Sequence, residues 1–342
     1  MTSSAPLAAS LPPAAVTVVL VAYNSGAYLA RCLEGLSRQS FRDFVTLIVD
    51  NRSTDGSIES LPPLGDRTRL VRMGENLGFA AANNRAAELS STPWIAMLNP
   101  DALPEPDWLA ALMAAVERHP DIVMFGSTQI RLDVPDRFDG VGDVYHASGV
   151  YWRGAYGWPL GSCERSGETF SPCAAAALYR RADFLAVGGF DERFFCYGED
   201  VDLAFRLRLQ GHRALQVGDA VVHHAGSASA GRYSPFTVYH SIRNRYWVFL
   251  KNMPAALLWP LLPAYVFASV LLVLLSSLRG RGGAALHGTW DAIGRIPAMW
   301  RSRREIQRRR LVPLARILRM LSWSPLLPFR RGPRLRPLQA GE

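Results

Sequence analysis

The sequence predicts an α/β fold: a mostly parallel central sheet with helices on both faces, followed by a helical C-terminal region. Apolar runs at 16–21, 45–49, 94–98 and 122–126 predict buried strands, and segments with helical spacing of apolar residues lie between them. Such alternation of strand and helix is the order that builds a parallel sheet. After residue 252 the sequence changes to a charge-free stretch and then to an arginine-rich tail.

The composition is that of one large domain with an appendage, or of two domains. The chain has 342 residues, of which 49% are hydrophobic, enough for a sizeable core. Its four cysteines have no paired spacing, which argues against a disulfide framework or a CxxC metal site and fits a reducing cytosol. Residues 1–15 contain three prolines and no basic n-region, so we expect a disordered lead-in rather than a signal peptide.

Positive charge is concentrated at the C-terminal end. From Arg279 onward, 15 arginines stand against three acidic residues, a net charge of +12. The whole chain carries +9, so the rest has a net charge of −3. This asymmetry points to a partner with negative charge, either an anionic membrane surface or nucleic acid.

The first strand, 16–21, runs into Tyr23 and Asn24. Helical spacing begins at Ala27, with Ser25 as the expected N-cap. A helix N-terminus directly after a strand can face a phosphate group, although an ordinary strand-to-helix turn explains this segment about equally well.

The second strand, 45–49, ends at Asp50, whose carboxylate can accept hydrogen bonds from a base imide or a ribose hydroxyl. Asp55-Gly56 indicates a turn, and Ser57 is the expected cap of a further helix. No GxGxxG follows either strand, which weighs against a dinucleotide-dependent dehydrogenase.

A helix expected at 80–89 carries Asn83 and Asn84 on its first turns. Asparagine is a poor residue in a helix interior, so the pair indicates either a polar task near a site or simple capping. The strand 94–98 then leads to Asp101 at a proline turn. Ligands bind beyond the carboxyl ends of strands in open α/β sheets, and a carboxylate there can hold a hard divalent cation that grips a diphosphate.

The alternation then stops. Residues 131–167 are rich in glycine and aromatic residues, and we expect either a substrate-contacting insertion or a plain surface flap. Glu199 and Asp200 begin a helix behind several aromatic residues; the helix macrodipole accounts for one or two acids there, and partial desolvation would raise a carboxyl pKa toward that of a general base. A strand at 217–222 leads to a histidine pair that ends at His224. A histidine at a strand end can be a metal ligand or an acid–base group, and a lone pair of histidines is usually neither.

Taken in order, these segments resemble family 2 glycosyltransferases with the GT-A fold, a Rossmann-like architecture, over about 16–252. The motifs that carry the resemblance are Val21-Ala22-Tyr23-Asn24, the segment 49–57, Asn76-Leu77-Gly78-Phe79 with Asn84, Leu98-Asn99-Pro100-Asp101, Gly189-Phe190-Asp191-Glu192, Glu199-Asp200-Val201-Asp202-Leu203, and His224 before Gly226-Ser227. Each motif is weak alone, but the whole set occurs in the family's order. The most similar subgroup is that of bacterial rhamnosyltransferases and their relatives in cell-envelope polysaccharide assembly.

The resemblance implies which residues bind the donor. Tyr23, Asn24 and Asp50 would hold the base and ribose, and Asn84 would face the sugar diphosphate. Arg243, near the start of a later helix, would reach phosphate, although an ordinary surface arginine explains it about as well.

The resemblance also implies the metal and catalytic residues. Asp101 and His224 would hold Mg²⁺ or Mn²⁺, with Asn99-Pro100-Asp101 standing in for the usual DxD motif, so that only Asp101 supplies a charged ligand there. Asp200 would be the catalytic base, and Glu199 would contact the acceptor beside it.

The function that the resemblance implies is that of an inverting hexosyltransferase, which moves a sugar from a nucleotide diphosphate to a hydroxyl of a lipid-linked cell-envelope glycan. dTDP-rhamnose is the favoured donor, with UDP-sugars and GDP-mannose open, and the acceptor would be a glycan or a polyprenyl-diphosphate-linked sugar. Two alternatives stay open: an inactive nucleotide-sugar-binding scaffold, and a basic-tailed RNA-binding protein. The tail lacks a recognisable RNA-binding module, so we expect no nucleic-acid partner.

Residues 253–278 contain no charged residue and are long enough to cross a bilayer. Nucleotide sugars lie in the cytosol, so a single crossing would put the arginine-rich tail outside, against the positive-inside tendency. We therefore expect 253–342 to be a membrane-associating helical region, re-entrant or peripheral on the cytoplasmic face of the inner (plasma) membrane. A hydrophobic helix buried in protein is the alternative.

Overall fold

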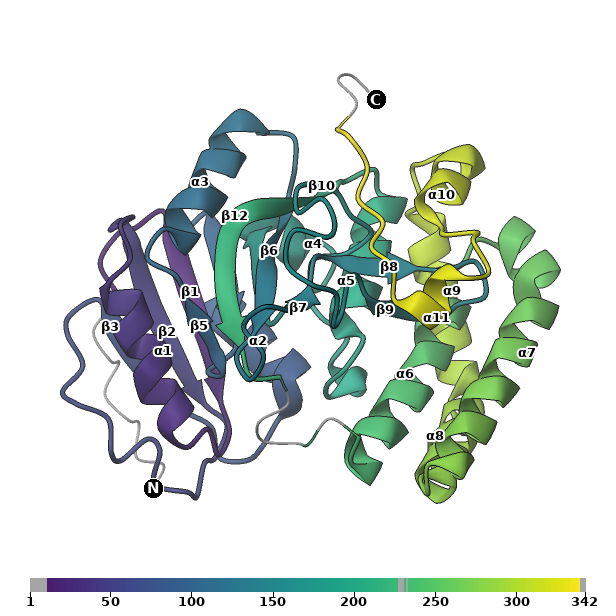
Figure 1. Ribbon diagram of the computed structural model, residues 1–342, viewed down its shortest axis with the longest axis horizontal. Coiled ribbons are helices and arrows are strands. Elements are labelled where there is room, and N and C mark those ends of the chain that lie inside the picture. The colour runs from purple at the N-terminus through teal and green to yellow at the C-terminus, as the bar shows by residue number, and fades with distance from the viewer. Residues whose placement is uncertain (1–10, 227–230, 232, 339–342) are drawn as a thin grey trace, which may run out of the picture.

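The computed structural model describes residues 11–226, 231 and 233–338. Of the expected lead-in 1–15, residues 1–10 lie outside the described residues, and so does Ser227 of the motif after His224. The chain forms a central sheet with helices on both faces and a group of helices at the C-terminal end (Figure 1).

The strands are β1 (Val16–Ala22), β2 (Phe44–Asp50), β3 (Thr68–Arg72), β4 (Trp94–Leu98), β5 (Ala102–Pro104), β6 (Met124–Arg131), β7 (Phe138–Gly140), β8 (Asp143–Tyr145), β9 (Tyr151–Arg153), β10 (Gly167–Glu168), β11 (Ala176–Arg180) and β12 (Ala214–His224). The helices are α1 (Ala27–Ser37), α2 (Gly78–Leu89), α3 (Trp108–Arg118), α4 (Arg181–Ala186), α5 (Glu199–Leu209), α6 (Pro235–Asn252), α7 (Ala255–Leu278), α8 (Gly282–Gly294), α9 (Ile296–Arg308), α10 (Leu314–Met320) and α11 (Leu327–Arg330).

The sheet has the order β10-β12-β6-β11-β4-β1-β2-β3, with β5 paired to β12 and β7 to β6. Pairs β1–β2, β1–β4, β2–β3 and β6–β12 are parallel, which confirms the mostly parallel α/β prediction. β11 departs from the predicted alternation of parallel strands and helices, because it runs antiparallel to both β4 and β6. The chain leaves β6 through the glycine-rich insertion and returns in the opposite direction, which inserts β11 between two strands that precede it in the sequence.

Apolar side chains explain how the helices cover the sheet. Leu29 of α1 and Leu112 of α3 join one core cluster with Val18 and other β-branched residues of the strands. Ala82 of α2 packs with Leu47 on the opposite face. Because side chains of a strand alternate between faces, apolar runs such as 94–98 are buried on both sides.

Two local predictions near the first strands are corrected. Gly26, not Ser25, is the N-cap of α1, and its N–H donates to Asp55 Oδ2 at 2.8 Å. Ser57 begins a turn instead of a helix, and its hydroxyl donates to Asp55 Oδ1 at 2.6 Å. One carboxylate therefore ties the two loops together, a long-range contact that local capping preferences do not anticipate.

The C-terminal helices are continuous with the core beneath them. Phe205 of α5 and Val248 of α6 share an apolar cluster with Tyr265 of α7, Met299 of α9 and Ile317 of α10. α7 and α8 run side by side at the far end of the molecule from β1–β3 (Figure 1). The sequence composition changes at residue 252, but residues on both sides of this position belong to one apolar cluster. A domain boundary at 252 stays a prediction.

α7 is long and apolar enough to cross a membrane, by length and composition alone. Only 17% of its most apolar window is buried, so the alternative of a helix buried in protein is not what the fold contains. Large apolar side chains are exposed along α7 and α8, among them Phe267, Leu278 and Trp290 at 72%, 84% and 76%. This apolar C-terminal helix fits a membrane-associated region.

Candidate active site

The main cavity, of about 1220 Å³, opens at the carboxyl ends of β1 and β4. Six of the residues predicted for the site line it: Tyr23, Asn24, Asp101, Glu199, Asp200 and His224. Asp101 and Asp200 therefore share one cavity, although 99 positions separate them in the sequence. Asp50, Asn84 and Arg243 do not line it.

The loops after β1 and β2 hold each other in place beneath Tyr23. The Asn24 N–H donates to Ser53 Oγ at 3.1 Å, and Asn24 Oδ1 accepts from the Thr54 N–H at 2.8 Å. Asn24 has a φ of 49°, in the left-handed region that asparagine tolerates. The Tyr23 ring remains 42% exposed on the cavity wall.

Asp50 is buried, in contrast to the predicted contact with base and ribose. Its carboxylate accepts the Ser53 N–H at 2.8 Å and so closes the turn after β2. The following residue, Asn51, lines the cavity instead, and its Oδ1 accepts the Leu77 N–H at 2.9 Å. Strand alternation explains the exchange, because adjacent side chains point in opposite directions.

Asn84 is likewise turned away from the predicted donor contact. Its Oδ1 accepts the Phe190 N–H at 2.8 Å, and its Nδ2 donates to the Phe190 carbonyl at 2.8 Å. A Cβ on Gly189 would lie 2.3 Å from Asn84 Oδ1, so this approach requires glycine. Asn84 therefore fixes the loop that leads to α5, rather than facing the cavity.

His224 lies between two carboxylates at the end of β12. Its Nδ1 donates to Asp139 Oδ2 at 2.8 Å, while Nε2 faces Asp101 Oδ1 at 3.4 Å, longer than a well-formed hydrogen bond. Arg153 forms an ion pair with the same Asp139. Burial opposes a charged imidazole, but Asp101 and Asp139 outweigh it and raise the pKa of His224 to about 9.

This arrangement fits a divalent metal ion. A metal-binding histidine commonly donates its second ring N–H to a carboxylate, which sets the tautomer and aims the other nitrogen at the metal. Here Asp139 takes that N–H, and the buried Nε2 has no hydrogen-bond partner among the described residues. Asp101 and His224 are thus arranged as a carboxylate–imidazole pair that can exchange a proton for a cation.

Glu199 and Asp200 form the first turn of α5. The turn begins at Gly198, in the left-handed conformation with a φ of 84°, and the helix N-terminus favours the acids that follow. Asp200 Oδ2 accepts the Ala174 N–H at 3.1 Å, which ties it to the segment before β11. Burial raises the pKa of Asp200, and burial together with Asp200 raises the pKa of Glu199 well above its ordinary value.

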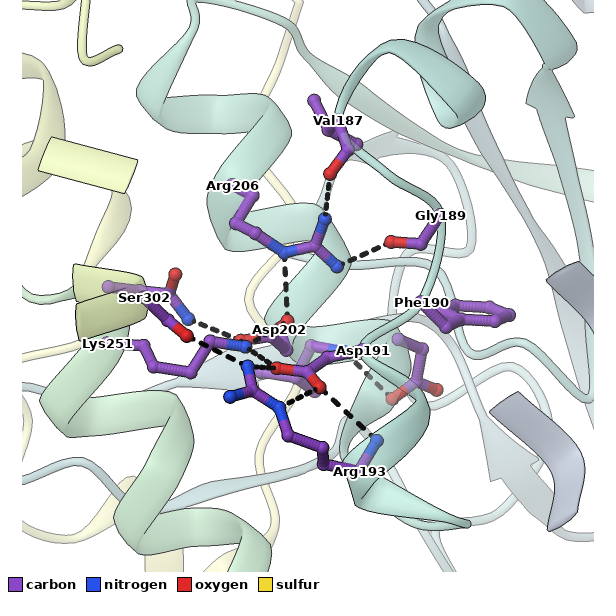
Figure 2. A network of polar contacts seen from close by, with 12 residues as sticks. Val187, Gly189, Phe190, Asp191, Arg193, Asp202, Arg206, Lys251 and Ser302 are labelled. Carbon is purple, nitrogen blue, oxygen red and sulfur yellow. Dashed lines mark hydrogen bonds and ion pairs between the residues drawn. The ribbon is translucent and has the colours of Figure 1, made fainter. Parts of the chain in front are cut away.

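A buried ionic network holds α5 in place (Figure 2). Lys251 of α6, the only lysine in the chain, forms ion pairs with Asp191 and with Asp202. Arg206 Nε donates to Asp202 Oδ2 at 2.9 Å, and its other nitrogens donate to the carbonyls of Val187 and Gly189 (Figure 2). The acid two positions after Asp200 therefore anchors the helix while Asp200 itself faces the cavity.

Arg243 also holds a loop in place, whereas the sequence predicted that it would contact the phosphate of the donor. Its Nη2 donates to the carbonyls of Arg193 and Phe194, at 3.1 Å and 2.9 Å. The guanidinium carbon lies 4.4 Å from the centre of the Trp247 ring. Arg243 is 8% exposed and holds the loop whose next residues, 195–197, line the cavity.

The insertion contributes residues that the motifs did not indicate. Asp143, Tyr151, Trp152 and Arg153 line the cavity from β8 and β9, so 131–167 is not a plain surface flap. Their signal in the sequence was the density of glycine and aromatic residues, which marks an unusual segment but names no side chain. The start of α6 adds Phe236, Thr237 and Ser241 to the cavity.

The fold is the GT-A fold, as its similarity to solved glycosyltransferases shows. The GalNAc-T7 structure with UDP, GalNAc and Mn²⁺ matches at a TM-score of 0.56 and 15% identity, over 70% of this chain and 48% of that one. The mannosyltransferase PcManGT from Pyrobaculum calidifontis, with GDP-Man and Mn²⁺, matches at 0.51 and 18% identity, over 86% and 85%. TarS 1-349 from S. aureus with UDP matches at 0.52 and 17% identity, over 86% and 90%.

The chain belongs to glycosyl transferase family 2, whose model matches residues 17–188. An N-acetylglucosaminyl-diphospho-decaprenol L-rhamnosyltransferase of Mycobacterium tuberculosis is 30% identical over 312 residues, covering 77% of this chain and 94% of that protein. The O-antigen biosynthesis protein RfbC of Myxococcus xanthus is 31% identical over 210 residues, or 57% of this chain and 16% of that protein. The predicted family, and its rhamnosyltransferase-like subgroup, are confirmed.

Proposed function

We propose that this glycosyltransferase transfers a sugar with inversion from a nucleotide diphosphate to an acceptor hydroxyl. The observation that carries the proposal is the shared cavity of Asp101 and Asp200. Asp200 removes the proton from the acceptor hydroxyl, and that oxygen bonds to the anomeric carbon. The bond from that carbon to the diphosphate breaks, and its electron pair leaves with the nucleoside diphosphate. One displacement assisted by one base inverts the anomeric configuration.

The donor binds on the β1–β4 side of the cavity in this proposal. Tyr23 offers an exposed ring to the base, and Asn24 lies beside it on the preformed loop. Asp101 and His224 would hold Mg²⁺ or Mn²⁺, with Asp139 orienting the imidazole. A bound divalent ion would supply positive charge against the negative charge that grows on the leaving diphosphate.

The proposed donor is dTDP-rhamnose and the proposed acceptor a polyprenyl-diphosphate-linked sugar. The support is the 30% identical Mycobacterium tuberculosis relative, whose printed name states rhamnosyl transfer to N-acetylglucosaminyl-diphospho-decaprenol. UDP-sugars and GDP-mannose are the competing donors, since the solved relatives contain UDP and GDP-Man.

The proposed location is the cytoplasmic face of the inner membrane, with 253–342 lying on or re-entering the bilayer. α8 returns alongside α7 and packs closely on α6, where a Cβ on Gly288 would lie 2.6 Å from the Tyr239 carbonyl oxygen. The turn of this hairpin lies at the start of α6, where Arg281 Nε donates to the Tyr233 carbonyl at 2.8 Å, and α8 and α9 return the chain to the end of α6 from which α7 departs. Exposed arginines of α9 and its C-cap follow and suit anionic headgroups; they are Arg301, Arg304, Arg308 and Arg309.

The donor assignment is tested by a thermal-shift panel of dTDP-rhamnose, UDP-sugars and GDP-mannose, with and without Mn²⁺, followed by transfer to a short-chain polyprenyl-diphospho-N-acetylglucosamine. We expect the largest Mn²⁺-dependent shift with dTDP-rhamnose and a rhamnosylated lipid product. A donor that binds without any transfer would support the inactive scaffold instead.

The membrane assignment is tested with the full chain, because the C-terminal helices share a core with α5. We expect Phe267→Ser with Trp290→Ser to weaken binding to vesicles containing anionic phospholipid, whereas Leu160→Ser, on an exposed residue outside the C-terminal helices, leaves it unchanged. Equal binding by all three proteins would contradict the proposed surface.

A further inference from the structure

Asp143 is a buried acid at the cavity that the transfer mechanism leaves without a task. Asp143 is 6% exposed and lines the cavity, and its carboxylate forms no hydrogen bond or ion pair with the described residues. Because this carboxylate opens on the cavity, it can accept hydrogen bonds from a molecule bound there. A ligand that fills the cavity is therefore the partner to consider for Asp143.

The backbone around Asp143 is held rigidly even though its side chain has no partner. Its N–H donates to the Ser171 carbonyl at 2.8 Å, and its carbonyl accepts from Thr169 Oγ1 at 3.2 Å. The preceding Gly142 has a φ of +78°, and a Cβ there would lie 2.3 Å from Thr169 Oγ1. The carboxylate is thus placed in advance, as a binding group requires.

The position of Asp143 relative to the proposed base suggests the partner's chemistry. Carboxylate oxygens of Asp143 and Asp200 and the Cys173 sulfur lie within 4.8 Å of one another. A hydrogen bond from a hydroxyl to a carboxylate spans about 2.6 Å, so two adjacent hydroxyls of one sugar ring can each reach one of these acids. The Tyr151 hydroxyl and Glu199 Oε2, both buried beside the same cavity, also have no hydrogen-bond partner among the described residues.

A cation is a weaker match for the same three groups. Burial raises the pKa values of Asp143, Asp200 and Cys173, that of the thiol to about 12, so the thiol is not a ready metal ligand. The Arg153 charge acts on all three groups and already supplies positive charge at this position. Hydroxyl groups need no further charge there.

We propose that Asp143 binds the hydroxyl adjacent to the one that Asp200 deprotonates, so that the enzyme selects acceptors with a vicinal diol. This inference rests on the proposed transfer reaction and adds the feature of the acceptor that the site recognises. Asp143 acts as a specificity-determining residue, while Asp200 performs the proton transfer.

The test combines Asp143→Ala and Asp143→Asn with a set of acceptors in the full-length protein. The acceptors are a short-chain polyprenyl-diphospho-N-acetylglucosamine and its 3-, 4- and 6-deoxy analogues, with dTDP-rhamnose as donor. We expect Asp143→Ala to lower kcat/KM for the parent acceptor by about 10- to 100-fold. For the wild type, kcat/KM should be lower by a similar factor with one deoxy analogue that remains a substrate. For Asp143→Ala, kcat/KM should be the same with that analogue as with the parent acceptor.

Several readouts separate this inference from its competitors. The inference would be overturned if, for every analogue, the loss in kcat/KM from the missing hydroxyl multiplied the loss from Asp143→Ala. An Asp143→Ala variant that transfers like the wild type would also overturn it. Weaker Mn²⁺ binding by Asp143→Ala without acceptor would assign the cluster to a cation and overturn it too. A wild type that transfers to none of these acceptors would remove the proposed function itself.

Folding is checked by thermal unfolding, and Asp143→Asn provides a shape-conserving variant. The matched control is Asp219→Ala, which removes an acid whose side chain is 87% exposed on β12. We expect the control to keep wild-type kinetics with every acceptor. A folded Asp143→Asn variant with wild-type selectivity among the deoxy analogues would contradict the proposal, because an amide cannot replace a carboxylate as a strong acceptor.

Discussion

The two sides of the cavity differ in how their polar groups are paired. Beneath Tyr23, the loop groups bond to one another, as Asp55 does with Gly26 and Ser57. Beside Asp200, the Asp143 carboxylate lines the cavity and forms no hydrogen bond or ion pair with the described residues, while the Tyr151 hydroxyl is buried without a hydrogen-bond partner among them. The loops beneath Tyr23 are therefore fully paired before any ligand arrives, while the groups beside Asp200 can still accept hydrogen bonds.

This difference suggests a division of tasks. A preformed loop network needs little reorganisation to receive a nucleotide, so it suits the donor, which many related enzymes share in kind. Polar groups that have no partner within the protein can bond hydroxyl groups without first breaking a bond of their own. In the proposed function, the side of the cavity beside Asp200 therefore determines which acceptors are used. Four predictions test this difference between the two sides.

The largest expected effect comes from Asp200→Asn, which removes the base while conserving shape. We expect transfer to fall by about 10²- to 10⁴-fold, because general-base assistance is lost. Donor-induced thermal shifts should stay close to those of the wild type, since the donor contacts lie on the other side of the cavity. Near-normal turnover by the purified variant would make the assignment of the base wrong.

Lys251→Met should destabilise the acceptor side from beneath. The substitution removes the buried cation that Asp191 and Asp202 share and leaves each of them one arginine partner; breaking a buried ion pair typically costs about 3–5 kcal/mol. Chemical denaturation measures the loss in the free energy of unfolding. The control is Arg85→Met, which breaks an exposed pair with Glu88 and should cost less than about 1 kcal/mol.

The pH dependence of transfer should report the buried acid. Asp200 acts as a base only when deprotonated, and burial raises its pKa, so the rate falls as the pH drops through a value above the ordinary ~3.9 of aspartate. Below that value we expect a loss approaching tenfold per pH unit in kcat. An acidic limb at or below pH ~4 would mean that Asp200 is not desolvated in the complex.

The smallest effect is expected on the donor side, from Ser53→Ala. This change removes the acceptor of the Asn24 N–H, one neutral hydrogen bond worth about 1 kcal/mol. Donor affinity should weaken by no more than about fivefold, with selectivity among acceptors unchanged. Ser37→Ala, whose hydroxyl donates only within α1, is the control. A change in acceptor selectivity would contradict the separation of the two sides.

The order of apolar runs and polar endings was sufficient to predict the α/β fold and a site at Asp101, and the resemblance to family 2 glycosyltransferases placed Asp200 at the same site. Parallel strands share one edge of a sheet for their carboxyl ends, so Asp101 beyond β4 and His224 at the end of β12 converge whatever lies between them. Periodicity also located α1 and α2, with errors at the cap Gly26, where a distant carboxylate decides the geometry, and at Ser57, where a turn replaces the expected helix.

Only the tertiary structure decided which way the polar side chains turn. Asp50, Asn84 and Arg243 satisfy backbone groups of loops 3 to 106 positions away, because a buried polar group takes whichever partner the packing offers. Asp139 and Asp143 reach the site through an irregular insertion with no periodic pattern to place them. The order of elements in the sequence specifies the edge of the sheet at which the site lies. Three-dimensional packing decides which acids at that edge have partners within the protein and which are available to a substrate.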